Sequence, residues 1–199
     1  RLQIINQINH TLLVPELIDF QLLVDEILSV ERNKGLPTEF SISAKIEPSL
    51  VVFSDKSILK LILENLIDNG IKFADTANRK NSFVHIAILN QEPGVIIKVT
   101  DNGIGFKNVT PDQVFKMFIR ASERSETGGI GMYLTKLSTE KLGGSIKLTN
   151  TPEDFTEFTV TLPADLRLVI KKRDEMEQRL QVEKMLIAQN RLVDSPKSV

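Results

Sequence analysis

Apolar residues recur at every third or fourth position along four stretches of the chain, which is the spacing of an amphipathic helix. We expect helices over about residues 2–13, 17–32, 55–73 and 130–142. The first helix stops before Pro15, because a proline disfavours helical backbone in the residue ahead of it. Ser54 and Asp55 precede the third helix and are typical of an N-cap. The pattern therefore predicts four helices in the first 163 residues.

Apolar and polar residues alternate along other stretches, as in strands with one buried face. These stretches cover residues 40–46, 83–89, 95–100, 146–149 and 155–162, with a further short strand at 50–53. Residues 90–94 join two of the strands as a pair. Between residues 101 and 129 the chain has no regular period, and a loop that long inside a compact domain is usually functional or disordered. The pattern therefore predicts a sheet, with one long polar loop between its strands along the chain.

Residues 164–193 differ from the rest of the chain because they contain neither Gly nor Pro. We expect one helix, with apolar residues near heptad spacing at Leu166, Val169, Met176, Leu180 and Ile187. Arg173 and Glu183 interrupt that seam, so the pattern allows a coiled coil but does not require one. The strip is too apolar to stand in water alone. The helix is therefore expected to pack on the domain, to pair with another copy or to lead into a further domain.

Composition narrows the class of protein. The 199 residues are 41% hydrophobic and 26% charged, which excludes a wholly disordered or collagen-like chain. No apolar run reaches the roughly 18 residues of a membrane-spanning helix. The net charge is −1, so nucleic acid is not expected as a partner. Without cysteine there is no disulfide and no thiolate metal site. The chain begins with Arg1 rather than Met, so we expect a piece of a longer protein.

Two asparagines stand out in the predicted helix 55–73. Asn65 and Asn69 are four residues apart, hence on one face. Asparagine is a poor residue for a helix interior, and Asn69-Gly70 is a turn signal inside a helical pattern. Two departures from local preference within one turn indicate a functional site. The alternative is two polar residues that the helix merely tolerates.

Two glycine-containing segments are the other candidates for chemistry. Asp101-Asn102-Gly103-Ile104-Gly105 follows an apolar strand, so a carboxylate and a closely approachable backbone come together. An ordinary Asn-Gly turn would look the same. Gly129 and Gly131 open the predicted helix 130–142, where free backbone N–H groups can face an anion such as phosphate. No Gly-Lys-Ser/Thr follows, so this is not a Walker A loop, and flexible loop punctuation is the alternative.

In this order, the segments resemble the ATP-binding catalytic domain of sensor histidine kinases, in the GHKL superfamily of ATPases. The matching stretches are residues 64–73 (N box), 101–105 (first G box), 115–122 (F box) and 129–134 (second G box). The resemblance covers about residues 15–163. Residues 1–14 resemble the end of a dimerisation and phosphoacceptor helix, and residues 164–199 fall outside the pattern.

The resemblance implies an α+β fold, the two-layer Bergerat sandwich, in which a mixed and mostly antiparallel sheet carries helices on one face. It implies a lid at about residues 107–127. The activity implied is donation of the ATP γ-phosphoryl group to a histidine on a dimerisation domain of the same protein, with Mg²⁺. Further partners are a response regulator receiver domain and a second copy in a full-length homodimer. The domain would be cytoplasmic, in a protein that could be anchored in the inner membrane.

On the base side, the resemblance assigns Asp101 to the adenine amino group, which is how ATP is told from GTP. Gly103 and Gly105 would let the base approach, and Asn69 would line the pocket. Phe115 and Phe118 would anchor the lid by burial; plain core aromatics are compatible with that role.

On the phosphate side, the resemblance implies that Asn65 holds Mg²⁺ and that the second G box, with Gly129 and Gly131, cradles phosphates. Lys72 could reach a phosphate, or be a solvated helix lysine. Arg120 and Arg124 are further candidates for phosphate contacts, although exposed arginines often have no such role.

In gyrases, mismatch-repair ATPases and heat-shock chaperones of the same superfamily, a glutamate stands where this chain has Asn65. An amide is not a general base, so the site suits holding ATP without hydrolysis. Two departures remain. Thr127 replaces the usual first glycine of the second G box, and no His-Glu/Asp-x-Arg-x-Pro motif occurs, since neither His10 nor His85 fits it. The alternatives are therefore a non-catalytic nucleotide-binding or scaffolding relative, or an anti-sigma-factor-type serine kinase, against which the helical residues 1–14 argue.

Overall fold

The computed structural model describes residues 5–6, 8, 10–75, 77, 81–106, 109–116 and 130–193. The chain divides into two units, Arg1–Leu166 and Arg167–Val199, which are described separately. The first holds the sheet and its covering helices, and the second is formed almost entirely by one helix, α6 (Leu166–Val193).

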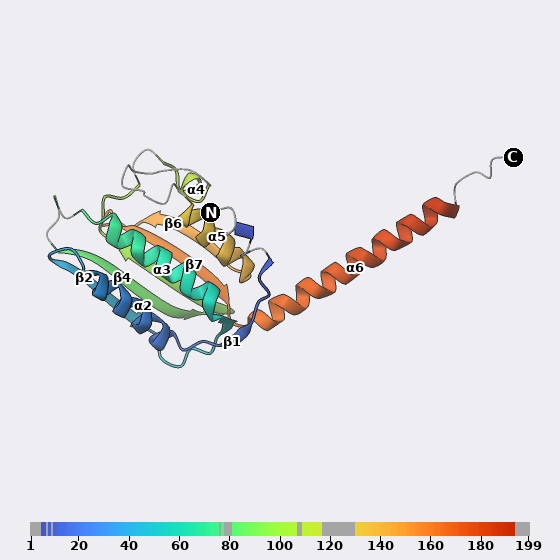
Figure 1. The fold of residues 1–199 in the computed structure, drawn as a ribbon, viewed down its shortest axis with the longest axis horizontal. Coiled ribbons are helices and arrows are strands. Elements are labelled where there is room, and N and C mark those ends of the chain that lie inside the picture. The colour runs from blue at the N-terminus through green and yellow to red at the C-terminus, as the bar shows by residue number, and fades with distance from the viewer. Residues whose placement is uncertain are drawn as a thin grey trace. The chain divides into compact units, whose positions relative to one another are not determined.

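A five-stranded sheet organises the first unit. Its strands follow the order β2 (Phe40–Ile46), β4 (Ser82–Gln91), β5 (Gly94–Asp101), β7 (Thr156–Pro163) and β6 (Ser145–Asn150). The β2–β4 pair is parallel and the other three pairs are antiparallel (Figure 1). This is the mixed, mostly antiparallel sheet that the sequence predicts, and the prediction is confirmed.

Three helices cover one face of that sheet: α2 (Phe20–Lys34), α3 (Lys56–Lys72) and α5 (Gly131–Lys141) (Figure 1). Strand residues alternate accordingly, so that Val84, Ile86 and Ile88 of β4 are fully buried beneath the helices. The core lies between the layers, with α3 packed on both α2 and α5. The intervening side chains of β4 are only partly buried, so the opposite face of the sheet is the open one.

The region before α2 differs from the sequence-based expectation. The helix begins at Phe20 rather than Leu17, because the side chain of Asp19 caps it and accepts a 2.9 Å hydrogen bond from the N–H of Leu22. The preceding residues form β1 (Pro15–Leu17), which pairs antiparallel with β3 (Phe53–Asp55). The short strand expected at 50–53 therefore lies a few residues later. The predicted cap of α3 is confirmed, since Asp55 accepts from the N–H of Ile58.

The chain ahead of β1 is helical at each of its described positions up to His10. Ile8 is buried in a small cluster with Ile130 and Leu134, at the start of α5. The ammonium of Lys141 donates a hydrogen bond to the carbonyl of Ile8. The end of the incoming helix is thus joined to α5 by apolar packing and one polar contact.

The second unit is helical, as its sequence predicts, and α6 runs for 28 residues. Within the described part of the chain, neither this helix nor a shorter one combines the length and the hydropathy that crossing a membrane requires.

Candidate functional site

A small cavity opens where the C-terminal end of α3 meets the ends of β5 and β7. The described residues that line it are Asn69, Phe73, Asp101, Gly105, Phe106, Thr156 and Phe158. Three of the predicted site residues are therefore brought together, although they lie up to 36 positions apart in the sequence (105 − 69). Thr156 is the β7 partner of Asp101 in the sheet register, which places both at the same edge.

Gly70 permits this meeting of α3 and the sheet. A Cβ atom at Gly70 would lie 2.4 Å from Cγ2 of Val84 and 3.4 Å from Cβ of Asp101. The Asn-Gly pair is therefore not a turn, because Gly70 is an interior residue of α3. The missing side chain lets the helix lie closely on β4 and β5, which brings Asn69 and Asp101 to the same cavity.

Asp101 is the buried charge of the site, with 6% of its surface exposed. Its Oδ1 accepts a 2.9 Å hydrogen bond from the backbone N–H of Gly103. Burial raises the pKa of the Asp101 carboxyl from 3.8 to about 6, and the Gly103 hydrogen bond acts in the opposite direction. At neutral pH the group is mostly ionised, and a buried carboxylate can accept a hydrogen bond from an amino group of a ligand.

Hydrogen bonds to α3 and β4 fix the loop after β5. Ile104 donates its N–H to the carbonyl of Phe73 at 2.9 Å, at the end of α3. Gly103 lies against the same carbonyl, since a Cβ there would come within 2.4 Å of that oxygen. Gly105 has a φ of +66°, which suits glycine, and it lines the cavity.

Asn102 holds the other side of this loop. Its Oδ1 accepts the N–H of Phe83 at 2.8 Å, and its Nδ2 donates to the carbonyl of Asn81 at 3.2 Å. Sequence reasoning gave this buried residue no role, because an Asn-Gly pair also fits an ordinary turn.

Aromatic side chains form one wall of the cavity. The ring of Phe158 contacts Phe106 and Phe115 edge-to-face, with centroids 5.8 Å and 6.2 Å apart. Phe115 is buried directly after the short helix α4 (Pro111–Val114), so its burial ties that helix to the cavity wall. Phe118 lies outside the described residues. Neither Phe158 nor Thr156 was singled out from the sequence, because both read as ordinary strand residues.

The residues expected on the phosphate side lie beyond the lining of this cavity. Asn65 is half-buried on α3, one turn before Asn69. Lys72 forms a 2.7 Å ion pair with Asp68 of the same helix. Gly131 is the first residue of α5, and a Cβ there would meet no described atom within 4 Å. Gly129, Arg120, Arg124 and Thr127 lie outside the described residues.

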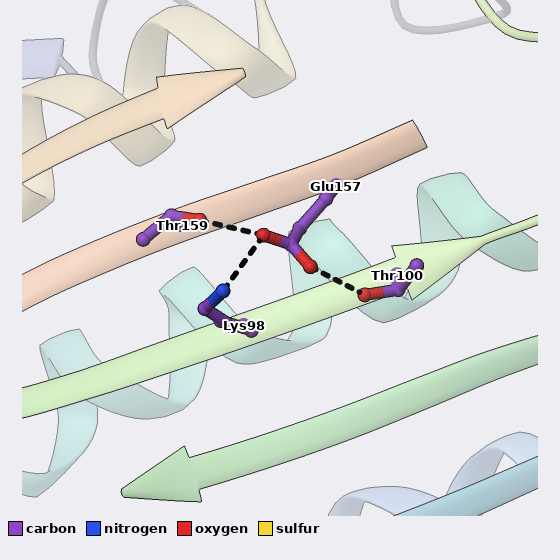
Figure 2. Close-up of polar contacts among 4 residues, drawn as sticks. All are labelled: Lys98, Thr100, Glu157 and Thr159. Carbon is purple, nitrogen blue, oxygen red and sulfur yellow. Dashed lines mark hydrogen bonds and ion pairs between the residues drawn. The ribbon is translucent and has the colours of Figure 1, made fainter. Parts of the chain in front are cut away.

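The open face of the sheet carries a polar network around Glu157, the residue that follows Thr156 in β7 (Figure 2). One carboxylate oxygen of Glu157 lies 3.0 Å from Nζ of Lys98 and accepts from the hydroxyl of Thr159 at 3.3 Å. The other accepts from Thr100 at 3.2 Å. Thr100 is the register partner of Glu157, just as Asp101 is the partner of Thr156, so the network ties together the strand ends that bear the site.

A metal ion would find few protein ligands here. Among the residues that the structure describes, no three His, Cys, Asp or Glu side chains gather in a way that could hold one. A Mg²⁺ ion keeps several waters and binds phosphate oxygens, so it needs only one or two protein oxygens.

Comparison with known proteins matches residues 54–166 to the family described as histidine kinase-, DNA gyrase B-, and HSP90-like ATPase. Among curated relatives, the autoinducer 2 sensor kinase/phosphatase LuxQ of Vibrio harveyi is 29% identical over 156 residues, 76% of this chain. The heme sensor protein HssS of Staphylococcus aureus is 27% identical over 156 residues, 78% of the chain. The chain spans only 18% of the length of LuxQ and 33% of HssS.

The fold also matches solved structures. One is the histidine kinase ThkA in complex with the response regulator protein TrrA, with a TM-score of 0.66 and 19% identity. The match covers 83% of this chain and 47% of that one. This likeness establishes the α+β sandwich that the sequence predicts.

Proposed function

Because this chain belongs to the family of histidine kinase-, DNA gyrase B- and HSP90-like ATPases, we propose that residues 15–163 are the ATP-binding catalytic domain of a sensor histidine kinase. The domain donates the γ-phosphoryl group of ATP to a histidine on a dimerisation domain. The observation that carries this proposal is the cavity in which Asn69, the buried Asp101 and Gly105 meet. The two curated relatives above are named as sensor proteins, one of them a kinase, which supports the choice within the family.

The cavity suits an adenine ring. Phenylalanine and glycine residues line it, as suits the faces of a flat heterocycle, and in this proposal the Asp101 carboxylate accepts a hydrogen bond from the amino group of adenine. Guanine carries a carbonyl oxygen at that position. This oxygen and the carboxylate oxygen are both acceptors, so no hydrogen bond could form between them. The site therefore selects ATP over GTP, because GTP would leave the Asp101 carboxylate and the guanine carbonyl oxygen without a hydrogen bond.

The phosphates extend from the base toward the N-terminus of α5. In this proposal Asn65 supplies an amide oxygen to Mg²⁺, and the second G box, with Gly129 and Gly131, would bind phosphate oxygens through backbone N–H groups. Lys72 would have to exchange its ion pair with Asp68 for a phosphate. Bound ATP supplies the transferable phosphoryl group, and the protein positions and neutralises it.

The site is suited to phosphoryl transfer rather than to hydrolysis. Asn65 occupies the position from which a carboxylate would activate water, and an amide cannot take that proton. Glu64, the preceding residue, points about 100° away around the helix. The phosphoryl group is therefore kept for an acceptor that brings its own base.

The partners of the proposed kinase are a dimerisation and histidine phosphotransfer domain of the same protein, and a response regulator receiver domain. ThkA, whose fold this chain shares, is known in complex with a response regulator. A homodimer of the full-length protein would place the dimerisation domain beside this one. ATP is a cytoplasmic substrate, so we place the domain in the cytoplasm.

Titration calorimetry with ATP and GTP, each with and without Mg²⁺, tests the binding site. We expect ATP to bind at least tenfold more tightly than GTP. The part of the affinity that comes from the triphosphate should depend on Mg²⁺. Equal affinities for the two nucleotides would contradict the role of Asp101.

Incubation with γ-labelled ATP tests the reaction. The chain has no histidine followed by an acidic residue and Arg-x-Pro, so we expect no label on it alone. A separately made dimerisation domain that carries the motif should become labelled in trans, and the label should be acid-labile, as phosphohistidine is. Tight ATP binding without transfer to any such domain would instead identify a scaffolding relative. Acid-labile label that is lost in His10→Ala would make His10 the acceptor.

A further inference from the structure

The helix α6 exposes large apolar side chains on several sides, and some of them follow heptad spacing; Leu168, Val182, Met185 and Leu186 lie off that line. Met176 is 72% exposed, Leu180 49% and Ile187 48%. With Val169 they occupy the a and d positions of successive heptads, which form a single seam along a helix. Such a line is unusual on a helix that stays alone in water.

The same seam carries two charges, and their positions distinguish the possible partners. Counting Leu166 as position a, Arg173 is also at a and Glu183 at d. In a parallel pair of identical helices, a faces a and d faces d, so Arg173 would face Arg173 and Glu183 would face Glu183. Each charged layer would then bury two like charges, which is strongly unfavourable.

In an antiparallel pair, position a faces position d of the other helix. If Met176 faces Leu180, continuing by heptads makes Arg173 face Glu183 and Val169 face Ile187. In this register Val169, Met176, Leu180 and Ile187 meet apolar residues, and Arg173 meets Glu183. Leu166, which is already buried in its own chain, falls opposite Asn190. A single antiparallel register brings all three pairs together. In an antiparallel pair the numbers of facing residues have a constant sum, and each of these three pairs adds to 356.

We propose that α6 binds α6 of a second copy of this chain in antiparallel orientation, with Arg173 paired to Glu183 of the second copy. The second copy is the occupant because the seam positions complement one another, with Arg173 opposite Glu183 and apolar residues opposite apolar ones from Val169 to Ile187. Near the two-fold axis, Glu177 and Arg179 each lie beside their own counterpart. These flanking positions are solvated and screened by salt, so we expect reversible association rather than a permanent dimer.

Cysteine cross-linking of the full chain tests the orientation without background, because the protein contains no cysteine. Val169→Cys and Ile187→Cys are made separately, and one of them carries a tag that changes its size. In the antiparallel register the two cysteines share a layer, so mild oxidation of the mixture should yield the mixed disulfide dimer. Each variant alone should stay largely uncross-linked, because its cysteines are 18 residues apart along the axis, about 27 Å.

The parallel arrangement predicts the reverse pattern: each variant would cross-link to itself, and the mixed product would be minor. That result, or a monomeric chain at near-millimolar concentration in sedimentation, would overturn the proposal. A monomer would mean that the strip packs on its own domain or belongs to a contact with a further domain.

Charge reversal tests the ion pair by a separate measurement. Glu183→Arg alone and Arg173→Glu alone should each weaken dimerisation at least tenfold in sedimentation equilibrium, because like charges then meet in two layers. The double variant restores opposite charges in the antiparallel register and should recover most of the affinity. A double variant no better than the single ones would refute the pairing, provided circular dichroism shows that all three keep their helix content.

Discussion

Asp101 and Glu157 lie on neighbouring strands of one sheet, but on opposite faces, and their surroundings differ sharply. Glu157 is on the open face, where an ammonium group and two hydroxyls contact its two oxygens (Figure 2). Asp101 lies beneath the helices, where the backbone N–H of Gly103 meets it. The protein satisfies the first carboxylate with its own side chains, whereas among the described residues the second meets a single backbone N–H.

This difference distinguishes a carboxylate that stabilises the fold from one that is available to a ligand. A partly buried carboxylate with a cation beside it holds strands together at little cost. A carboxylate buried without a cation disfavours its own charged form, as the raised pKa of Asp101 records. Such a group is retained when a ligand supplies the missing hydrogen bond, so Asp101 and not Glu157 is expected to bind nucleotide.

The comparison predicts its largest effect on ATP affinity. Asp101→Asn should weaken ATP binding by about 100-fold, since one buried hydrogen bond to a charged group contributes about 1.5–3 kcal/mol. The matched variant Glu157→Gln should change the affinity less than about threefold. Calorimetry on both variants decides the question, and similar losses in the two would remove the distinction between the faces.

The second effect concerns stability and its pH dependence. The folded-state pKa of Asp101 is raised to about 6 from 3.8, so the folded protein holds the proton more tightly. Its contribution to stability is complete below about pH 4 and is lost as the pH rises through 6. Asp101→Asn has no charge to bury, so at pH 8 it should be more stable than the native chain by about 2–3 kcal/mol.

Urea unfolding of the two proteins between pH 4 and pH 8 measures this difference, which should shrink toward zero at the acidic end. A variant that is less stable than the native chain at pH 8 would mean that the carboxylate is better satisfied than its burial indicates.

A third prediction asks whether helix and sheet must approach closely to build the site. Gly70→Ala places a methyl group against Val84, and the repacking should lower the free energy of unfolding by about 2 kcal/mol. ATP affinity should fall as well, because α3 moves away from Asp101. Gly131→Ala is the control for stability, since its Cβ meets no described atom within 4 Å. Equal stability of the two variants would show that the gap beside Gly70 is not needed.

The smallest effect is expected on the open face. Lys98→Met removes the cation beside Glu157 but keeps most of the side-chain volume, and it should cost less than about 1 kcal/mol of stability. Thermal unfolding followed by circular dichroism detects a change of that size. A much larger loss would show that the network on the open face sets the register of β5 and β7 at the cavity.

The sequence predicted those parts of the fold that have a clear period or cap. The paired strands β4 and β5 alternate over several residues, and α3 has both an apolar face and a capping Asp55. The strand β1 escaped notice because three residues are too few to show a period. Because β1 was not recognised, its last residue, Leu17, was assigned to α2. The helix in fact begins at Phe20, after its cap Asp19.

Of the residues that line the cavity, Asn69 could be singled out because asparagine is poor in a helix interior, and Asp101 because it ends a strand just before two glycines. Thr156 and Phe158 obey the alternation of β7, so nothing in the sequence marks them as cavity walls. Gly70 was noticed, but its reason lies in Val84 across the core, which the sequence does not place beside it. The roles of Asn65 and Lys72 toward phosphate and metal remain predictions.

The double fixing of the loop after β5 has a thermodynamic consequence. Asn102 holds its beginning to β4, and Ile104 holds its next turn to the end of α3. The backbone around Gly103 is therefore already ordered before a base arrives, and little conformational entropy is left to lose on binding. Most of the intrinsic attraction between the base and this part of the cavity is thus available as affinity.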